Sequence, residues 1–193
     1  RPFFRDYNQR LLDKARAKYA VEIIERSVAG VTVYDVAPTG GAADAPVLIC
    51  LHGGAFMWGE GPGALLEAVP ITAVARMRVL AVDYRLAPEH VYPAAVEDVV
   101  AVYRAVIETA DPAKVGLYGC SAGAVLTTQA VARLLRDGQA KPGAIGIFHG
   151  APVPFAGDAA LAQQLFDPRA GGAAAPRIEE LPYFQGADLA DPL

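Results

Sequence analysis

The chain has 193 residues and a net charge of −4, and 53% of its residues are hydrophobic whereas 20% are charged. This composition excludes a disordered polypeptide and indicates one compact domain with a real hydrophobic core. The acidic balance gives no reason to expect a nucleic-acid partner or an anionic membrane surface. No stretch reaches the roughly eighteen uninterrupted apolar residues of a membrane span.

The N-terminal elements are expected to be a helix and a hairpin. Apolar residues recur at three- and four-residue steps among basic ones over residues 6–19, which predicts an amphipathic helix. Stretches rich in Val then flank Ala29-Gly30, a pattern that predicts a β-hairpin. Residues 37–44 are rich in Gly, Ala and Pro and predict an exposed loop.

The middle of the chain alternates between strands and helices. Short runs that are apolar on both faces predict strands at residues 47–51, 79–82, 115–118 and 144–148. Helices are predicted between and after them, at residues 64–76, 94–109 and 122–136. Two-sided apolar strands that alternate with helices indicate a mostly parallel sheet flanked by helices, which is the α/β class.

Beyond Gly150 the pattern loosens. A short helix at residues 159–166 and a mobile loop at residues 170–176 are predicted, but no further two-sided strand is found. The strand at residues 144–148 is therefore expected at an open edge of the sheet, where its apolar composition would favour aggregation. We expect that a further strand or a partner covers this edge, and that the C-terminal strands of the sheet are missing from the chain.

One pentapeptide predicts a nucleophile. Residues 119–123 read Gly-Cys-Ser-Ala-Gly, a G-x-S-x-G pattern directly after a predicted strand and directly before a predicted helix. The flanking glycines permit a tight strand-to-helix turn that would lift the Ser121 hydroxyl off the sheet, with the first N–H groups of the helix aimed at the reacting centre. A chance match in a Gly- and Ala-rich chain is the alternative, which the strand–turn–helix context disfavours.

A second glycine-rich segment predicts an oxyanion hole. Residues 52–56 read His-Gly-Gly-Ala-Phe and follow the first two-sided strand. Acyl transfer builds negative charge on a carbonyl oxygen, which fixed N–H groups must stabilise. Backbone amides of Gly54 and Ala55 could supply two donors and that of Ala122 a third. An ordinary glycine turn is the alternative for this segment taken alone.

Three segments carry a resemblance to a known family: residues 52–56, residues 83–90 (Asp-Tyr-Arg-Leu-Ala-Pro-Glu-His) and residues 119–123. In their sequence, order and spacing they resemble the hormone-sensitive-lipase-like esterases of the α/β-hydrolase superfamily. The resemblance covers most of the chain from about Val28 onward. It implies a single α/β-hydrolase domain over residues 1–193, incomplete at its C-terminus, with a small helical cap formed by residues 1–26 and about 151–193.

The resemblance also implies the roles of site residues. Ser121 would be the nucleophile, the amides of Gly54, Ala55 and Ala122 the oxyanion hole, and His52 with Gly53 the support of the loop. Aromatic side chains in the cap segments could line an acyl or alcohol pocket, although packing in the core or cap is expected of each taken singly: Phe3, Phe4, Tyr7, Tyr183 and Phe184.

Three positions depart from the family pattern. Ala55 stands where the loop usually has its third glycine, which leaves the N–H in place but reduces the freedom of the turn. Cys120 precedes the nucleophile where Asp or Thr is common, and Ala124 replaces a frequent glycine. With these departures, Ser121 stays the expected nucleophile.

The sequence offers no convincing catalytic acid or base. In this fold the chain order is Ser, then Asp or Glu, then His, and His149 is the only histidine after Ser121. It follows the next strand at once, so we expect a structural or pocket-rim residue there. His90 is expected to brace its turn, and Arg85 to form an ion pair with Glu89. We therefore expect a fragment of a longer enzyme, with little or no hydrolysis if these 193 residues were the whole polypeptide.

The expected function is hydrolysis of short- to medium-chain carboxylic esters through an acyl-enzyme on Ser121. The alternatives are a non-catalytic small-molecule binder on the same fold, an inactive fragment, or an acyl hydrolase that acts on thioesters or amides. No metal and no organic cofactor is implied. Cys50 and Cys120 fit two thiols in a reducing cytoplasm better than a disulfide. The oligomeric state stays open, a homo-oligomer included.

Overall fold

A computed structural model describes residues 2–41, 46–150 and 180–188 and forms a six-stranded sheet in the order β1-β2-β4-β3-β5-β6. The strands are β1 (Val21–Val28), β2 (Val31–Pro38), β3 (Val47–Leu51), β4 (Arg78–Asp83), β5 (Val115–Cys120) and β6 (Ala144–Phe148). Strands β4, β3, β5 and β6 run parallel, whereas β2 pairs antiparallel with both β1 and β4. The predicted α/β class with a mostly parallel sheet is confirmed.

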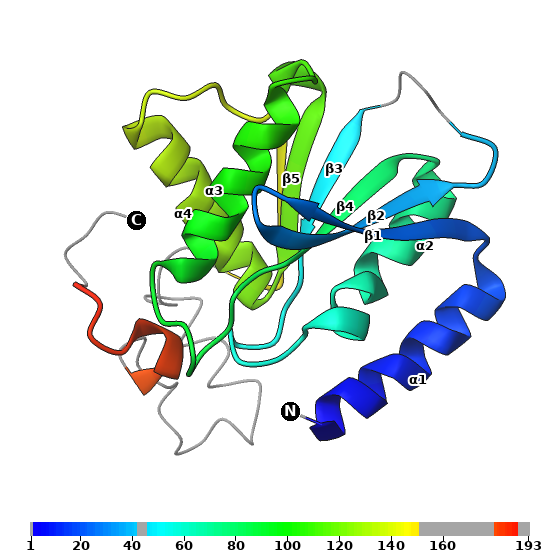
Figure 1. The fold of residues 1–193 in the computed structure, drawn as a ribbon, viewed down its shortest axis with the longest axis horizontal. Coiled ribbons are helices and arrows are strands. Elements are labelled where there is room, and N and C mark those ends of the chain that lie inside the picture. Colours follow the sequence, from blue (N-terminus) through cyan, green and yellow to red (C-terminus); the bar gives the residue numbers. More distant parts are fainter. Residues whose placement is uncertain (1, 42–45, 151–179, 189–193) are drawn as a thin grey trace, which may run out of the picture.

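Helices cover both faces of this sheet (Figure 1). They are α1 (Pro2–Lys18), α2 (Leu65–Ala75), α3 (Ala94–Ile107) and α4 (Ala122–Arg136), with short 3-10 turns η1 (Gly61–Gly63), η2 (Pro112–Lys114) and η4 (Pro182–Phe184). Helices α3 and α4 pack on one face, and α1 and α2 lie over the other. The four helices predicted within the described residues are confirmed, with the first beginning four residues earlier than expected, at Pro2 instead of Asp6.

Alternate residues along the central strands pack into two separate hydrophobic cores, one on each face of the sheet. In β3, Ile49 and Leu51 pack into the cluster that includes α3 and α4, whereas Cys50 between them packs into the cluster of α1 and α2. All three side chains are buried. Because successive strand residues point to opposite faces, a strand covered on both sides must be apolar at every position, which explains the unbroken apolar run in the sequence.

The antiparallel end of the sheet is fixed by a hairpin and a charge cluster. Ala29 and Gly30 turn the chain with φ of 51° and 83°, as the predicted hairpin requires. Asp35 of β2 accepts hydrogen bonds from Arg26 of β1 at 2.8 Å and from Arg78 of β4 at 2.7 Å. Burial alone would raise the pKa of Asp35, but these guanidinium groups lower it below its ordinary value. The ion pairs thus join three strands.

The opposite edge of the sheet is apolar and exposed. Side chains on β6 remain accessible, with exposed fractions of 52% at Ile145, 39% at Ile147 and 53% at Phe148. The prediction that this strand lies at an edge is confirmed. The helix predicted at residues 159–166 and the loop at residues 170–176 lie outside the described residues, as do most of the proposed second cap segment and residues 42–45.

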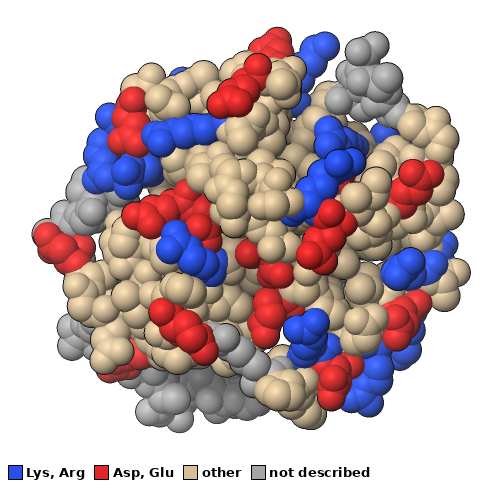
Figure 2. Space-filling model, viewed as in Figure 1, with Lys and Arg blue, Asp and Glu red and all other residues tan. Residues whose placement is uncertain are grey.

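None of the helices in the described part of the chain is long and apolar enough to cross a membrane. On the face seen in Figure 2, acidic and basic side chains are interspersed and neither sign gathers into a broad patch. Such a mixed surface is typical of a globular domain whose charges are mainly solvated.

Candidate active site

Ser121 occupies a strained turn between a strand and a helix. It follows the last residue of β5 and precedes the first residue of α4, with φ of 54° and ψ of −119°. Non-glycine residues rarely adopt positive φ, and such strain gathers at functional sites. Its backbone N–H donates to the carbonyl oxygen of Phe148 at 2.9 Å, which anchors the turn to the end of β6. Ser121 is exposed. Its strained backbone geometry is the one expected of a nucleophile elbow.

The elbow depends on a close approach of α4 to β3. A Cβ atom on Gly123 would overlap the carbonyl oxygen of Leu51 and lie 2.7 Å from that of His52. Glycine at this position therefore lets the first turn of the helix lie against the end of the strand. The N–H of Ala122 belongs to that first turn, whose amides lack acceptors within the helix.

The glycine-rich segment at residues 52–56 packs directly against the elbow. A Cβ atom on Gly53 would lie 3.1 Å from the Cys120 carbonyl oxygen and 3.3 Å from Ser121 Cβ. The segment then reverses, because the amides of Met57 and Trp58 both donate to the carbonyl oxygen of Gly54, at 2.9 and 3.1 Å. The structure thus brings together the two segments that the sequence singled out.

Three residues of this loop have positive φ, namely Gly54, Ala55 and Phe56, the last with φ of 60°. Gly54 has φ of 122°, and a Cβ atom there would lie 2.7 Å from the carbonyl carbon of Trp58, so the position requires glycine. Ala55 has φ of 51°, which costs an L residue about 1 kcal/mol relative to glycine. The loop therefore keeps the shape of a glycine turn despite the departure at Ala55, and it carries strain there.

His52 is buried and held in one orientation beneath the loop. Its Nδ1 forms a hydrogen bond with the carbonyl oxygen of Gly53 at 2.8 Å, and its ring stacks on Tyr84 with centroids 4.2 Å apart. Burial lowers the pKa of His52 to about 4, although the Gly53 carbonyl and the nearby Glu60 oppose the shift. The imidazole is therefore neutral near pH 7, with Nδ1–H as the donor.

The segment at residues 83–90 supports the same loop through hydrogen bonds to its backbone carbonyl groups. The Tyr84 hydroxyl donates to the carbonyl oxygen of His52 at 2.6 Å, and the Ala87 amide donates to that of Phe56 at 2.8 Å. Tyr84 is itself buried. These contacts fix both ends of the glycine-rich segment, and sequence reasoning did not find them because the partners lie about thirty residues apart in the chain.

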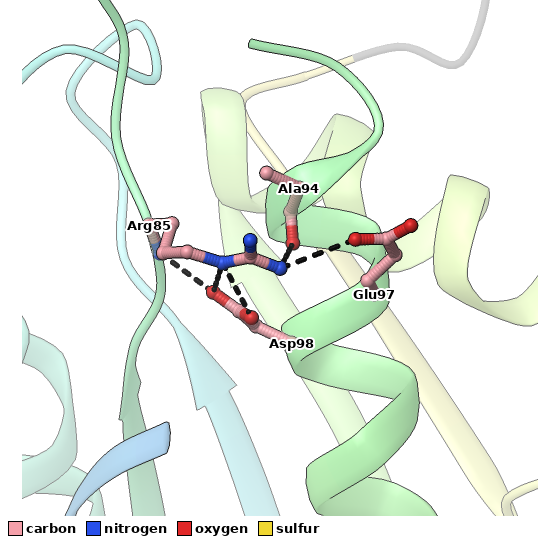
Figure 3. Close-up of polar contacts among 4 residues, drawn as sticks. All are labelled: Arg85, Ala94, Glu97 and Asp98. Atoms are coloured by element: carbon pink, nitrogen blue, oxygen red, sulfur yellow. Dashed lines mark hydrogen bonds and ion pairs between the residues drawn. The ribbon is translucent and has the colours of Figure 1, made fainter. Parts of the chain in front are cut away.

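Arg85 anchors this supporting segment to α3 (Figure 3). Its Nε lies 2.9 Å from Asp98 Oδ1, its backbone N–H donates to Asp98 Oδ2 at 2.8 Å, and its terminal nitrogen reaches Glu97 at 3.2 Å. The Asp98 carboxylate is buried, whereas the guanidinium is partly exposed. The sequence analysis expected Arg85 to pair with Glu89 and did not predict Glu97 or Asp98, which lie in the following helix, α3.

A cavity of about 420 Å³ opens beside the loop. The residues that line it come from α1, from the glycine-rich loop and from the start of α2: Phe3, Phe4, Tyr7, Asn8, Gly53, Gly54, Trp58, Gly59, Gly63, Leu66 and Glu67. Phe3, Phe4 and Tyr7, three of the five aromatic residues predicted as pocket candidates, thus line a cavity. The other two, Tyr183 and Phe184, are buried in η4, where Tyr183 stacks on Phe56 with centroids 4.2 Å apart.

A carboxyl group and a thiol meet between this cavity and the elbow. The Glu67 side chain lines the cavity and interacts with the Cys120 thiol, next to Ser121. Burial raises the pKa of Glu67, and the thiol partly offsets the rise. Burial also raises the pKa of Cys120, so the thiol is protonated near neutral pH. Sequence reasoning noted Cys120 as a departure but missed Glu67, because an acidic residue in a helix is usually solvated.

No base for Ser121 is found in the described part of the chain. His149 follows β6 with φ of 50°, and a Cβ atom on Gly150 would lie 2.8 Å from the Ser121 carbonyl oxygen, so this segment borders the elbow. However, the described residues show no hydrogen bond between the serine hydroxyl and an imidazole or carboxylate. Within the same residues, no three His, Cys, Asp or Glu side chains are grouped to hold a metal ion.

Comparison with known proteins identifies the class. A family model described as "alpha/beta hydrolase fold" matches residues 48–182, and the chain therefore belongs to the α/β-hydrolase family. The esterase E25 crystal structure aligns with a TM-score of 0.79 at 30% identity, covering 97% of this chain and 59% of that one. A structure described as an esterase from the bacterial hormone-sensitive lipase family aligns at 0.62 and 33%, covering 70% and 47%. Within its family, the chain is a hormone-sensitive-lipase-like α/β hydrolase, as the resemblance predicted.

Sequence relatives agree with this placement. LipR from Mycobacterium tuberculosis is 40% identical over 135 residues, which are 69% of this chain and 43% of that protein. Carboxylesterase NlhH from the same species is 40% identical over 101 residues, or 48% and 30% of the two chains. An acetyl-hydrolase from Streptomyces hygroscopicus is 39% identical over 102 residues, or 52% and 34%. The chain thus spans less than half the length of these relatives.

Proposed function

We propose that this chain carries the nucleophile and the oxyanion hole of a serine esterase that hydrolyses short- to medium-chain carboxylic esters. The observation that carries the proposal is the strained Ser121 at the β5–α4 junction, with Gly53 of the glycine-rich loop packed on its Cβ. Names of the relatives support the substrate class, since they include a carboxylesterase and an acetyl-hydrolase.

In the proposed reaction, Ser121 Oγ attacks the ester carbonyl carbon and forms a C–O bond while its proton passes to a base. The carbonyl oxygen becomes negative and accepts hydrogen bonds from the amides of Gly54, Ala55 and Ala122. The bond to the alcohol oxygen then breaks, with the proton passing from the base to the leaving alcohol. Water then attacks the acyl carbon and gives a proton to the base, and the bond from that carbon to Ser121 Oγ breaks as the serine takes up this proton, which releases the carboxylic acid.

Hydrogen bonds fix the conformation of the loop that supplies two amides of the proposed oxyanion hole. His52 fixes the Gly53 carbonyl, and Tyr84 fixes the His52 carbonyl, so the amides that follow keep their direction. Preorganised donors contribute because they need no rearrangement when charge develops, and the loss of one donor costs about 10²–10³ in kcat. Burial and a pKa of about 4 fit this supporting role and make His52 a weak proton acceptor, which disfavours it as the base for Ser121.

A non-catalytic binder on the same fold is the second candidate. The observation that favours it is the lack of a hydrogen bond from Ser121 to an imidazole among the described residues, together with a formed cavity. The two candidates make opposite predictions about turnover.

Hydrolysis of p-nitrophenyl esters by the intact protein separates them. We expect turnover of the acetate, butyrate and octanoate esters, less turnover of the palmitate ester, and none above background in Ser121→Ala. Ser27→Ala, which removes an exposed serine from β1, is the matched control and should retain wild-type rates. Equal rates in the wild-type protein and Ser121→Ala would overturn the esterase proposal and leave the binder.

A further inference from the structure

We propose that the cavity between α1 and the glycine-rich loop binds a small organic cation, of the alkylammonium or quaternary ammonium class. The proposal rests on the aromatic walls of the cavity and on the carboxyl group of Glu67 in its lining. If Ser121 is an esterase nucleophile, as proposed above, the cation would be part of the ester substrate. This would make choline-type esters the preferred substrate class.

The walls offer aromatic surface that the fold itself leaves uncovered. Phe4 stacks on Trp58 with ring centroids 4.6 Å apart and an interplanar angle of 8°, and Phe3 meets the edge of Phe4 at 5.5 Å. Exposed fractions are 69% at Phe3 and 49% at Tyr7. Exposed aromatic clusters mark binding sites, and the faces of aromatic rings attract cations.

The charge of the cavity selects for a cation over a neutral apolar group. Among the described residues that line it, Glu67 is the only one with an acidic or basic side chain. The titratable groups that interact with Glu67 are Cys120 and Tyr118 on β5, Cys50 on β3, and Tyr84 after β4. Burial raises the pKa of all four, so they are uncharged near neutral pH and do not compensate a carboxylate. Burial raises the pKa of Glu67 itself, and a bound cation would supply the missing positive charge that favours its ionised form.

The cavity is placed to hold one end of a molecule whose other end reacts at Ser121. Gly53 lines the cavity and also packs on Ser121 Cβ, at 3.3 Å from a Cβ atom built on the glycine. Glu67 also reaches the elbow, through the side chain of Cys120. A short ester could therefore extend from the aromatic walls to the serine.

The single tryptophan of the chain is Trp58, so its fluorescence reports on this cavity directly. We would titrate the Ser121→Ala protein with acetylcholine and, separately, with 3,3-dimethylbutyl acetate, a neutral ester of the same shape. Removing the nucleophile prevents turnover, so binding is measured whether or not the protein is an esterase. At pH 8, acetylcholine is expected to bind about tenfold more tightly than its neutral counterpart.

Substitution of Glu67 gives the decisive comparison. In Glu67→Gln the preference for acetylcholine should fall to about twofold or less, whereas Glu60→Gln, which removes a charge outside the lining, should keep it. Equal affinities for the two esters before substitution, or a preference that survives Glu67→Gln, would overturn the proposal. If Glu67→Gln fails to fold, Phe4→Leu on α1 serves instead and should weaken acetylcholine binding severalfold. An unchanged affinity in that variant would count against the site.

The outcome is separable from that of the esterase proposal. Cation preference in Trp58 fluorescence without hydrolysis of any ester by the wild-type protein would contradict the esterase alone. Hydrolysis of neutral esters without cation preference would contradict the cation site alone.

Discussion

The buried neutral state of His52 makes the stability of this protein depend on pH in a defined window. In the unfolded chain this imidazole has its ordinary pKa of 6.5, and in the folded protein burial lowers the pKa to about 4. Below pH 6.5 the unfolded state therefore binds a proton that the folded state does not, and stability falls as the pH decreases. The loss is complete near pH 4, where the folded state also becomes protonated.

The magnitude follows from the two pKa values. The difference between 6.5 and about 4 corresponds to about 3 kcal/mol, at ~1.4 kcal/mol for each pH unit. Other groups titrate in the same range, since burial raises the pKa of Asp83 and of Glu67. Their contribution has the opposite sign, because a carboxyl group with a raised folded-state pKa gains stability as the pH falls. A variant comparison is therefore needed to isolate the histidine.

The assay is urea unfolding at intervals from pH 7.5 to pH 4, followed by circular dichroism. His52→Phe keeps a ring to stack on Tyr84 but cannot titrate, so its stability curve should lack the loss of about 3 kcal/mol. His90→Gln removes one exposed imidazole and is the matched control. If the wild-type and His52→Phe curves run parallel between pH 6.5 and 4, the account of His52 as a buried neutral support is refuted.

The remaining predictions concern packing at the same site. Asp98→Asn should destabilise the protein by about 2–4 kcal/mol in urea unfolding, because it leaves the Arg85 guanidinium without its buried carboxylate; a loss below about 0.5 kcal/mol would contradict the anchoring role. Gly123→Ala should cost about 3 kcal/mol or abolish folding, since its Cβ would overlap the Leu51 carbonyl oxygen. Gly138→Ala, with φ of 65° and open space around it, should cost only about 1 kcal/mol; similar losses in both would be inconsistent with the close approach of α4 to β3.

Much of the fold can be predicted because its pattern is local. Strands buried on both faces read as unbroken apolar runs, and the helices between them end near turn residues, so β3, β4, β5 and β6 lie where the sequence places them. The hairpin follows from Ala29-Gly30. Helix α1 begins earlier than predicted because its first residues, Phe3 and Phe4, are exposed aromatics that carry no amphipathic signal.

The candidate site also has one part that the sequence predicts and another that only the folded structure reveals. The elbow at Ser121 and the glycine-rich loop are visible in the sequence because their chemistry requires residue types at fixed spacing. By contrast, Tyr84 below the loop, Asp98 beside Arg85 and Glu67 beside Cys120 become neighbours only after folding. Their residue types are common on surfaces, so no local pattern distinguishes a buried tyrosine hydroxyl or carboxylate from a solvated one.

The central claim is that Ser121 is an activated nucleophile, and covalent labelling tests it most directly. The intact protein would be treated with a fluorophosphonate, digested and analysed by mass spectrometry, with Ser27→Ala and Ser121→Ala treated in parallel. We expect a single adduct on the peptide that contains Ser121, retained in Ser27→Ala and absent from Ser121→Ala. An unmodified Ser121 peptide in the folded wild-type protein would contradict the account.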